Sequence, residues 1–552
     1  MDKYEIAQVL REIGMLVELT EPNPKKGIAY QRAATTIESI PCLEKVIQED
    51  SFESLPYIGM NMSKMIHLLI KNGSIPYQKM LQTRIPEPLL SLSRIPGLRL
   101  NKIRILYETF GIGSIDDLET LFKNNPKIKG FGPSFIYKML LRIAKIKKEG
   151  LRFLYPKAYY LAQMIQDISK GIVDKMEIAG DLRRKCEVIS QLDFVAVPKD
   201  PKEFISFFSN HGLIEKVLHK NEHSIQVLLK QGILLYIQLC TKKDYVYQLH
   251  QLTGNHKHLE QLPLIPQQCF RNEHALYRHL EMPFILPELR EGKGELEAAK
   301  KNCLPQLIEE KDLKGTFHCH TLDSDGSNTI EELAAAAKKL KWEYLGIADH
   351  SKSSYQANGM NEERLFAQIE KIKNFNKKKN NPYIFSGLEC DILKDGELDF
   401  PNEILKELDY VIVSIHRYFN LDEPEMTRRL IKAIENPYTT MIGHLTGRLL
   451  TFREPYQLDI PKVIDACIAN QKIIEINGTP SRMELDWRWW IKAKEKGLKC
   501  VINPDAHSLR DLKNCAYGIQ VARKGWLERK DVINTFPLSQ IKNYLNLANN
   551  FF

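Results

Sequence analysis

The stretch Tyr344-Leu345-Gly346-Ile347-Ala348-Asp349-His350 is an apolar run that ends in two ionisable side chains. A short apolar run between turn signals is typical of a strand buried on both faces. Seven such runs occur in the C-terminal half, namely Phe317–His320, Tyr344–His350, Tyr383–Glu389, Tyr410–His416, Met441–His444, Ile473–Asn477 and Cys500–His507. Helix-period segments lie between them, including Ile330–Leu340, Glu362–Lys373, Glu425–Ile434, Pro461–Ile468 and Trp489–Glu495. This alternation predicts a parallel sheet closed as a (β/α)7 barrel.

Ligand-type side chains stand at the carboxyl ends of six of these seven runs. In a (β/α) barrel these ends share one rim, where active sites lie. A single imidazole there is more often a structural hydrogen-bonding group. Many imidazoles and carboxylates together would repel one another or stay unpaired unless cations neutralised them. The nine candidates are His318, His320, Asp325, His350, Glu389, His416, His444, Asp505 and His507.

Nine ligands exceed the four or so that one transition metal takes, so two or three divalent ions are expected. The mixture of nitrogen and oxygen donors favours Zn²⁺, Mn²⁺ or Fe²⁺ over Mg²⁺ and Ca²⁺. Adjacent ions can clamp a phosphate, activate a water molecule and stabilise the leaving oxygen. The pattern therefore predicts a metal-dependent phosphoesterase.

The N-terminal segment 1–150 is expected to be helical and holds three related glycine turns before amphipathic helices. Backbone N–H groups at such helix starts can face a phosphate. Residues 51–150 also contain 16 Lys and Arg against 7 Asp and Glu. We interpret the turns as helix-hairpin-helix elements that bind the DNA backbone independently of sequence. The candidate DNA-binding residues are Gly59, Gly97, Gly130, Gly132 and Lys102.

Length and composition exclude several classes of protein. A chain of 552 residues is too long for one domain, and 43% hydrophobic and 27% charged residues are ordinary globular values. No apolar run is long enough for a bilayer span, and the ten cysteines occur singly without a CxxC pair. We expect a monomeric cytoplasmic protein without a membrane partner, associated with the nucleoid when on DNA.

The C-terminal motifs resemble the PHP (polymerase and histidinol phosphatase) domain, through phrases such as His318-Cys319-His320, Ser324-Asp325-Gly326 and Asp505-Ala506-His507-Ser508. Phrases elsewhere, including Pro287-Glu288-Leu289-Arg290-Glu291-Gly292, resemble the bacterial X-family DNA polymerases (PolX) over essentially the whole chain. The resemblance implies a lyase-like helical domain at 1–85, a fingers-like region at 86–150, a nucleotidyltransferase-like α+β palm at 151–240, a thumb-like region at 241–300, a linker at 301–314 and a PHP domain at 315–552.

The palm departs from the family pattern, in which three aspartates hold two metal ions. Only Asp193 remains of these, because Gln191 stands at the first position and Tyr236 matches the third by hydrophobic pattern. Asp181 replaces a serine that in the family offers a hydroxyl to the triphosphate. A neutral amide and a phenol cannot replace two anions, so we expect Mg²⁺ binding at the palm to be weak and polymerase activity to be lost.

We therefore expect a DNA repair protein that removes nucleotides or phosphate from 3′ ends of gapped or primer-template DNA. The candidate phosphate contacts are Arg183, Arg184, Arg448 and Arg453. Three alternatives stay open: a working DNA polymerase with a PHP exonuclease, a phosphatase of small metabolites, and a non-enzymatic DNA-binding adaptor.

Overall fold

The structure is a computed structural model that describes residues 1–21, 25–85, 87–124, 127–266, 268–378 and 380–550. The chain forms two compact units. Unit 1 comprises residues 1–183, 188–253 and 266–276, and unit 2 comprises residues 184–187, 254–265 and 277–552. The six segments predicted from the sequence divide the chain more finely than these two units and remain predictions.

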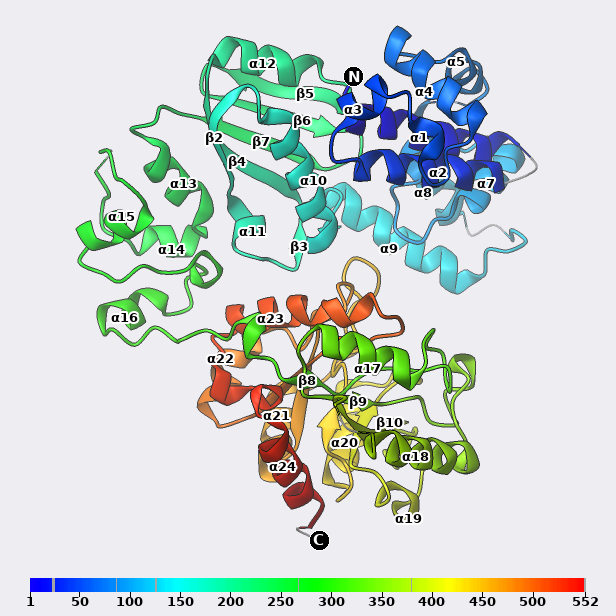
Figure 1. The fold of residues 1–552 in the computed structure, drawn as a ribbon, viewed down its shortest axis with the longest axis vertical. Helices are drawn as coiled ribbons and strands as arrows, with labels where there is room; N and C mark the ends of the chain where they lie inside the picture. The colour runs from blue at the N-terminus through cyan, green and yellow to red at the C-terminus, as the bar shows by residue number, and fades with distance from the viewer. Residues whose placement is uncertain (22–24, 86, 125–126, 267, 379, 551–552) are drawn as a thin grey trace. The chain divides into compact units, whose positions relative to one another are not determined.

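The N-terminal part of unit 1 is entirely helical in its described residues (Figure 1). Asp2 and Glu5 form a reciprocal capping box that satisfies the free N–H groups of the first helix. Apolar side chains spaced at helical period form one buried core through this region. The elements are α1 (Lys3–Thr20), α2 (Lys25–Ser39), α3 (Leu43–Gln48), η1 (Phe52–Ser54), α4 (Met60–Asn72), α5 (Pro76–Gln82), α6 (Glu87–Leu92), α7 (Leu100–Phe110), α8 (Ile115–Lys123) and α9 (Pro133–Glu149).

The three glycine turns connect helix pairs, as helix-hairpin-helix elements require. Gly59 and Gly132 are the N-cap residues of α4 and α9. Gly97 and Gly130 have φ angles of +82° and +86°, which side-chain-bearing residues rarely adopt. The turns therefore have the predicted backbone geometry, and their contact with DNA remains a prediction.

The rest of unit 1 contains a mixed five-stranded sheet of order β2-β4-β7-β6-β5. Its central strands β4 and β7 are parallel, and their register places Asp193 directly opposite Tyr236. The elements of residues 151–300 are β1 (Phe153–Leu154), α10 (Tyr155–Ser169), β2 (Val173–Ile178), α11 (Gly180–Arg183), β3 (Val188–Ile189), β4 (Gln191–Pro198), α12 (Pro201–Asn210), β5 (Ile214–Asn221), β6 (Ser224–Leu229), β7 (Leu234–Leu239), α13 (Tyr245–Thr253), α14 (His256–Glu260), α15 (Glu273–His279), η2 (Pro287–Leu289) and α16 (Glu295–Lys300).

Unit 2 is built around a parallel sheet of seven strands, β8 to β14 in chain order. A parallel bridge between Cys319 and Ala506 joins the segments that follow the first and the last strand, so the barrel is nearly closed. The strands are β8 (Gly315–Thr316), β9 (Tyr344–Ile347), β10 (Tyr383–Asp391), β11 (Tyr410–Ser414), β12 (Met441–Ile442), β13 (Ile473–Asn477) and β14 (Cys500–Asn503).

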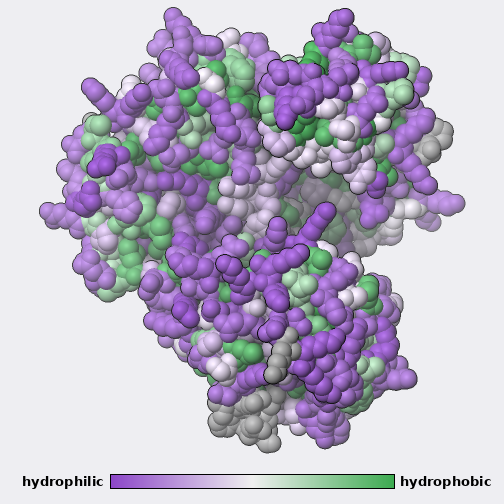
Figure 2. Space-filling view, in the orientation of Figure 1, coloured by the Kyte–Doolittle hydropathy of each residue, from purple (hydrophilic) through white to green (hydrophobic). Residues whose placement is uncertain are grey.

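Helices surround these strands (Figure 1). Apolar side chains of strands and helices form the core between them, whereas the face shown in Figure 2 is mostly hydrophilic. The remaining elements are η3 (Glu310–Asp312), α17 (Ile330–Lys339), η4 (Tyr355–Ala357), α18 (Glu362–Asn376), α19 (Asn402–Leu405), α20 (Glu423–Glu435), α21 (Ile460–Ala469), α22 (Trp487–Glu495), η5 (Asp511–Asn514), α23 (Cys515–Lys524), η6 (Arg529–Asp531), η7 (Ile533–Thr535) and α24 (Leu538–Asn550).

The predicted fold class is confirmed: a helical N-terminal region, an α+β sheet and a (β/α)7 barrel. Four predicted barrel runs were too long at their carboxyl ends, because the final histidines lie just after the hydrogen-bonded strands β9, β11, β12 and β14. The run Phe317–His320 was misplaced, since it begins only after β8 ends, whereas Glu389 lies inside β10, which is longer than predicted. Among the described residues, no helix combines the length and the apolar character that a membrane crossing needs.

Candidate metal centre

The nine ligand candidates converge at the carboxyl ends of the barrel strands. Eight of them form three groups whose ligand atoms lie within 4.8 Å of one another. The groups are His320, Asp325, His350 and His507; then His318, His320 and Asp505; and then His350, Glu389 and His416. Because neighbouring groups share His320 or His350, the three clusters form one continuous centre that can hold metal ions.

Glu389, at the end of β10, lies in the middle of this centre. Its Oε2 atom is 3.0 Å from His350 Nδ1 and 3.3 Å from His318 Nε2. Its Oε1 atom is 2.8 Å from His444 Nε2, which brings the ninth candidate to the same carboxylate. On the other side, Asp505 Oδ1 is 3.2 Å from His320 Nε2. Six side chains from the ends of five strands therefore lie within a few ångströms of one another.

Several buried polar atoms at the centre make no hydrogen bond within the described part of the chain: His318 Nε2, His320 Nδ1, His350 Nδ1, His444 Nδ1 and Glu389 Oε2. A buried polar atom without a partner costs about 1–3 kcal/mol. Glu389 Oε2 and His350 Nδ1 are close but not in hydrogen-bond geometry, as expected of two atoms directed at a shared cation. This donor set therefore fits divalent metal ions.

A second layer of side chains holds these ligands in position. Glu475 Oε2 is 2.6 Å from His318 Nδ1, so the other nitrogen of that ring faces Glu389 and Asp505. Asn477 donates to Asp505 Oδ2 at 3.1 Å, and Asp391 accepts from His416 Nδ1. Such partners fix the tautomer and orientation of ligating side chains. These three residues are not among the site candidates predicted from the sequence.

The electrostatics of the centre follow from burial and mutual attraction. Burial alone would lower the pKa of His318, but Glu475, Asp505 and Glu389 raise it well above its ordinary value. Burial would raise the pKa of Glu389, yet the surrounding imidazoles hold it well below its usual range. Burial and the neighbouring His350 lower the pKa of His320 to about 4. The carboxylates are therefore anionic, as metal ligands must be.

Backbone conformation also marks this centre. Asp505 has a φ of +51°, in the left-handed region that side-chain-bearing residues rarely adopt. Strained residues of this kind cluster at functional sites, where the surrounding structure enforces them. The turn directs the Asp505 carboxylate towards His318 and His320.

The sheet of unit 1 shows a different arrangement around Asp193, at the positions that the sequence matched to the metal-binding aspartates of the palm. Gln191 Nε2 donates to Asp193 Oδ1 at 2.6 Å, and Gln226 donates to Gln191 Oε1 at 3.0 Å. Tyr236 turns its hydroxyl to Gln238 Oε1, 2.6 Å away. Asp193 therefore accepts from a neutral amide, and the Tyr236 hydroxyl is directed to a different residue.

Comparison with known proteins agrees with these geometries. Residues 316–479 match the PHP domain family. The chain is 31% identical over 570 residues to the DNA polymerase/3′-5′ exonuclease PolX of Bacillus subtilis (strain 168), with 99% of each chain covered. The chain belongs to the PolX family. The PolX barrel alone is also similar to a probable phosphatase of Thermoanaerobacter sp. (strain X514), at 32% identity over 41% of this chain and 92% of that protein.

The predicted membership of PolX with a C-terminal PHP domain is confirmed, and so is the prediction of an enzyme. Relatives of the full chain and of its barrel carry enzyme names, and the PHP domain is a metal-dependent hydrolase fold. The nine-residue ligand set and the loss of polymerase activity remain proposals.

Three of the four arginines predicted to contact phosphate pair with acidic side chains of the protein. Arg183 pairs with Glu273 at 2.5 Å, and the buried Arg184 pairs with Glu291 at 3.1 Å. Arg448 binds Asp486 and the carbonyls of Arg482 and Met483. These contacts join segments far apart in sequence, which local motifs do not reveal. Contact of these three arginines with phosphate therefore remains a prediction.

Arg453 remains a candidate phosphate contact, and the structure adds Arg482. Arg453 donates through Nε to the Gly447 carbonyl at 2.9 Å. Arg482 lies beside the metal centre, with Nε 3.6 Å from Asp505 Oδ2. Its buried NH1 nitrogen makes no hydrogen bond among the described residues. The same nitrogen lies 3.7 Å from Glu484 Oε1, so Arg482 is flanked by two carboxylates. A guanidinium next to the ligands suits a phosphate oxygen.

Lys102, predicted to contact DNA, has a different immediate partner. Its Nζ atom donates to the Gly130 carbonyl at 2.9 Å and lies 3.7 Å from the ring centre of Phe135. The lysine thus connects α7 to the third glycine turn and supports that turn. We retain the four turn glycines as DNA-contact candidates.

Proposed function

We propose that this PolX protein hydrolyses DNA phosphodiesters at its PHP centre, in the 3′→5′ direction, while its palm no longer joins nucleotides. The observation that carries the proposal is the contrast between nine converging ligand groups in the barrel and one carboxylate bonded to an amide in the palm. The B. subtilis relative is named as a DNA polymerase and 3′-5′ exonuclease, which supports DNA as the substrate.

The chain's own residues prepare the centre for this reaction. His318, His320, Asp325, His350, Glu389, His416, His444, Asp505 and His507 would hold two or three divalent ions. Bound there, the ions would supply an activated water and stabilise the leaving oxygen. Glu475 and Asp391 orient two of the imidazoles. Arg482 is placed to bind a non-bridging oxygen of the scissile phosphate beside Asp505.

The palm is proposed to keep only a structural or DNA-holding role. Two divalent ions at a nucleotidyltransferase site need several carboxylates to offset their charge. Asp193 is matched in register by Tyr236 and bonded by Gln191. The Gln191 amide donates where the carboxylate of relatives would accept, so the site presents a proton instead of an anion to a cation.

A single assay tests both parts. A primer labelled at its 5′ end and annealed to a template is incubated with Mg²⁺, Mn²⁺ or Zn²⁺, with and without nucleotides. We expect shorter products and no longer ones, and no shortening by the His318→Ala and Asp505→Ala variants. Template-directed extension would contradict loss of the polymerase, and intact primer with every metal would contradict the nuclease.

A working polymerase is the second candidate, favoured by the printed name of the relative and by the retained palm sheet. A metabolite phosphatase is favoured by the names of the barrel relatives. Extension of the primer would identify a working polymerase. Release of phosphate from small esters, with no degradation of DNA, would identify a metabolite phosphatase.

A further inference from the structure

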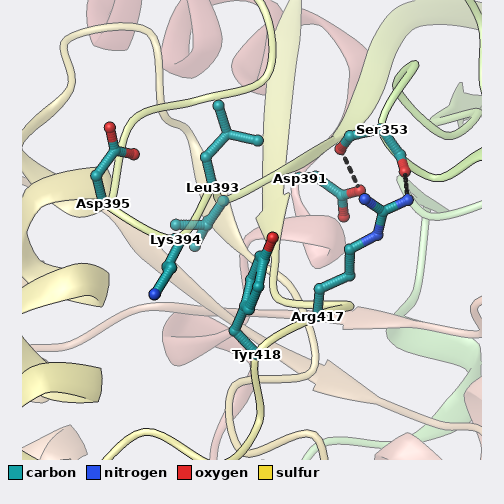
Figure 3. Close-up of a pocket in the computed structure, with 8 residues that line it drawn as sticks. Ser353, Asp391, Leu393, Lys394, Asp395, Arg417 and Tyr418 are labelled. Carbon is teal, nitrogen blue, oxygen red and sulfur yellow. Dashed lines mark hydrogen bonds between the residues drawn. The ribbon is translucent and has the colours of Figure 1, made fainter.

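A pocket of about 520 Å³ lies beside the metal centre in unit 2 (Figure 3). Its volume is within the range of roughly 300–1,000 Å³ that small-ligand sites occupy. Asp391 lines the pocket and also accepts the hydrogen bond from the ligand candidate His416. The same carboxylate accepts from Ser353 at 2.6 Å. A molecule in this pocket would therefore lie next to the group that acts on phosphate.

The walls of the pocket combine an exposed aromatic ring with two cations. Tyr418 is 52% exposed, and in Figure 3 its ring stands between the side chains of Lys394 and Arg417. Lys394 Nζ is 5.9 Å from the centre of the Tyr418 ring. The Arg417 guanidinium donates to the Ser353 carbonyl and lies 4.5 Å from the Tyr355 ring centre. Aromatic rings beside cations are the usual surface for single-stranded nucleic acid.

The backbone holds Tyr418 in an unfavourable conformation. Its φ is +57°, which is uncommon for a bulky side chain. The structure keeps this ring largely in solvent despite the cost of the conformation. A buried aromatic side chain would repay such strain by packing, whereas an exposed one is more readily explained by a ligand.

Other exposed apolar side chains follow the same rim. Among described residues of the barrel domain, seven large hydrophobic side chains are exposed. Five of them lie in loops that follow candidate ligands along the chain, namely Leu322, Tyr355, Tyr418, Phe452 and Leu509. An apolar rim of this kind suits the bases of a strand better than a small polar phosphate ester.

We propose that this pocket binds the 3′-terminal nucleotide of a single DNA strand, with its base stacked on Tyr418 and its backbone beside Lys394 and Arg417. Asp395 lines the pocket on a tight turn, in which Gly396 donates to the Leu393 carbonyl. Its carboxylate repels a further phosphate but accepts a hydrogen bond from a terminal 3′-hydroxyl. The inference rests on the proposed exonuclease function and names the part of the substrate that the site selects.

The kinetic test compares two substrates of the full-length protein. One is a dT10 oligonucleotide, and the other is bis(4-nitrophenyl) phosphate, which has no base or sugar. Tyr418→Ala should lower kcat/KM for dT10 by about 5- to 100-fold, the range for one stacked base. Hydrolysis of the small diester should stay within about twofold of wild type. Equal losses on both substrates, or no loss on dT10, would overturn the proposal.

Two control variants separate the ring from its hydroxyl and from general surface effects. Tyr418→Phe keeps the stacking face and should retain the wild-type rate on dT10. Phe366→Ala removes another exposed aromatic side chain, 41% exposed, that does not line the pocket, and should also retain it. A loss in Phe366→Ala as large as in Tyr418→Ala would overturn the assignment to this pocket.

A cross-linking experiment tests the pocket without hydrolysis. The probe is dT10 with 5-iodouracil as its 3′-terminal base, irradiated with wild-type protein in EDTA. We expect the cross-link on the tryptic peptide 418–428 and its loss in Tyr418→Ala. A cross-link confined to other peptides would overturn the proposal. If wild type degrades neither substrate, the exonuclease proposal fails, and the mapped peptide still decides the pocket.

Discussion

The barrel and the palm both bring polar side chains together on neighbouring parallel strands. In the barrel, Glu389 receives imidazoles from several strand ends. In the palm, β4 and β7 place Asp193 opposite Tyr236, and Gln191 bonds to the remaining carboxylate. The backbone therefore preserves both scaffolds, while charge is concentrated in only one. A metal site therefore needs carboxylates and imidazoles that the protein leaves available for a cation, and a suitable fold alone does not provide it.

The first prediction removes the central charge of the barrel. Glu389→Gln should lower the rate of DNA degradation by more than ~100-fold and leave fewer metal ions per chain, since replacing even an outer partner of a metal ligand costs 10–100-fold in affinity or activity. Metal per chain by mass spectrometry and primer shortening measure this. Glu397→Gln is the matched control, because that side chain is exposed and pairs with Lys432. If Glu389→Gln kept the wild-type number of metal ions per chain, Glu389 would not be a ligand that these ions share.

The sequence predicted the ligands of the barrel but not their supports. His350 and Glu389 end apolar runs, so the rule for barrel rims identifies them. Glu475 lies inside the run Ile473–Asn477, where its contact with His318 depends on packing across the barrel. A signal was available, because Glu475 and Asn477 alternate with apolar residues and therefore share one face. A buried acid on a strand without an adjacent base indicates a partner elsewhere.

Long-range pairing also explains the arginines. Arg448 is close to His444 in sequence, which suggested the barrel mouth, but it pairs with Asp486 from a loop 38 residues later. Arg482 lies near no predicted ligand in sequence, yet folding places it beside Asp505. Proximity along the chain therefore revealed neither contact, and the role of Arg448 at a phosphate stays a prediction. The hydrophobic pattern matched Tyr236 to a position of the family, and only the structure shows that this residue pairs in register with Asp193.

The second prediction tests whether Glu475 holds the metal-ligand candidate His318 in position. Glu475→Gln removes the charge that fixes His318 and should weaken metal binding by about 10- to 100-fold, with a fold that persists. Metal titration of protein stripped with a chelator, followed by circular dichroism, separates affinity from folding. A variant with wild-type affinity would show that Glu475 does not orient the ligand.

The third prediction separates two neighbouring arginines. Arg482→Ala should lower kcat/KM for DNA by about tenfold, as expected for one charge-assisted hydrogen bond to phosphate, and should leave the metal content unchanged. Arg448→Ala should instead destabilise the protein by about 1–3 kcal/mol, because it leaves Asp486 and two carbonyls without their donor. Thermal unfolding and steady-state rates measure the two effects. A loss of stability in Arg482→Ala and a loss of rate in Arg448→Ala would mean that Arg448 contacts the phosphate and Arg482 stabilises the fold.

The fourth prediction returns carboxylates to the palm. Gln191→Asp combined with Tyr236→Asp restores the two missing anions around Asp193, in a His318→Ala background that prevents degradation. We expect an additional bound Mn²⁺ by equilibrium dialysis, at millimolar affinity because few carboxylates hold it. Slow template-directed addition of a nucleotide should accompany it, and the additional substitution Asp181→Ser should increase the rate by removing like charge.

The background variant alone provides the control for this last experiment, because it keeps the amide and the phenol. It should bind no additional Mn²⁺ at the same concentration and extend no primer. Extension by that control would mean that other acids rebuild the site. Failure of the substituted palm to bind the ion would mean that its strands have shifted as well as lost charge, so that neutralisation is only part of the difference between the two regions.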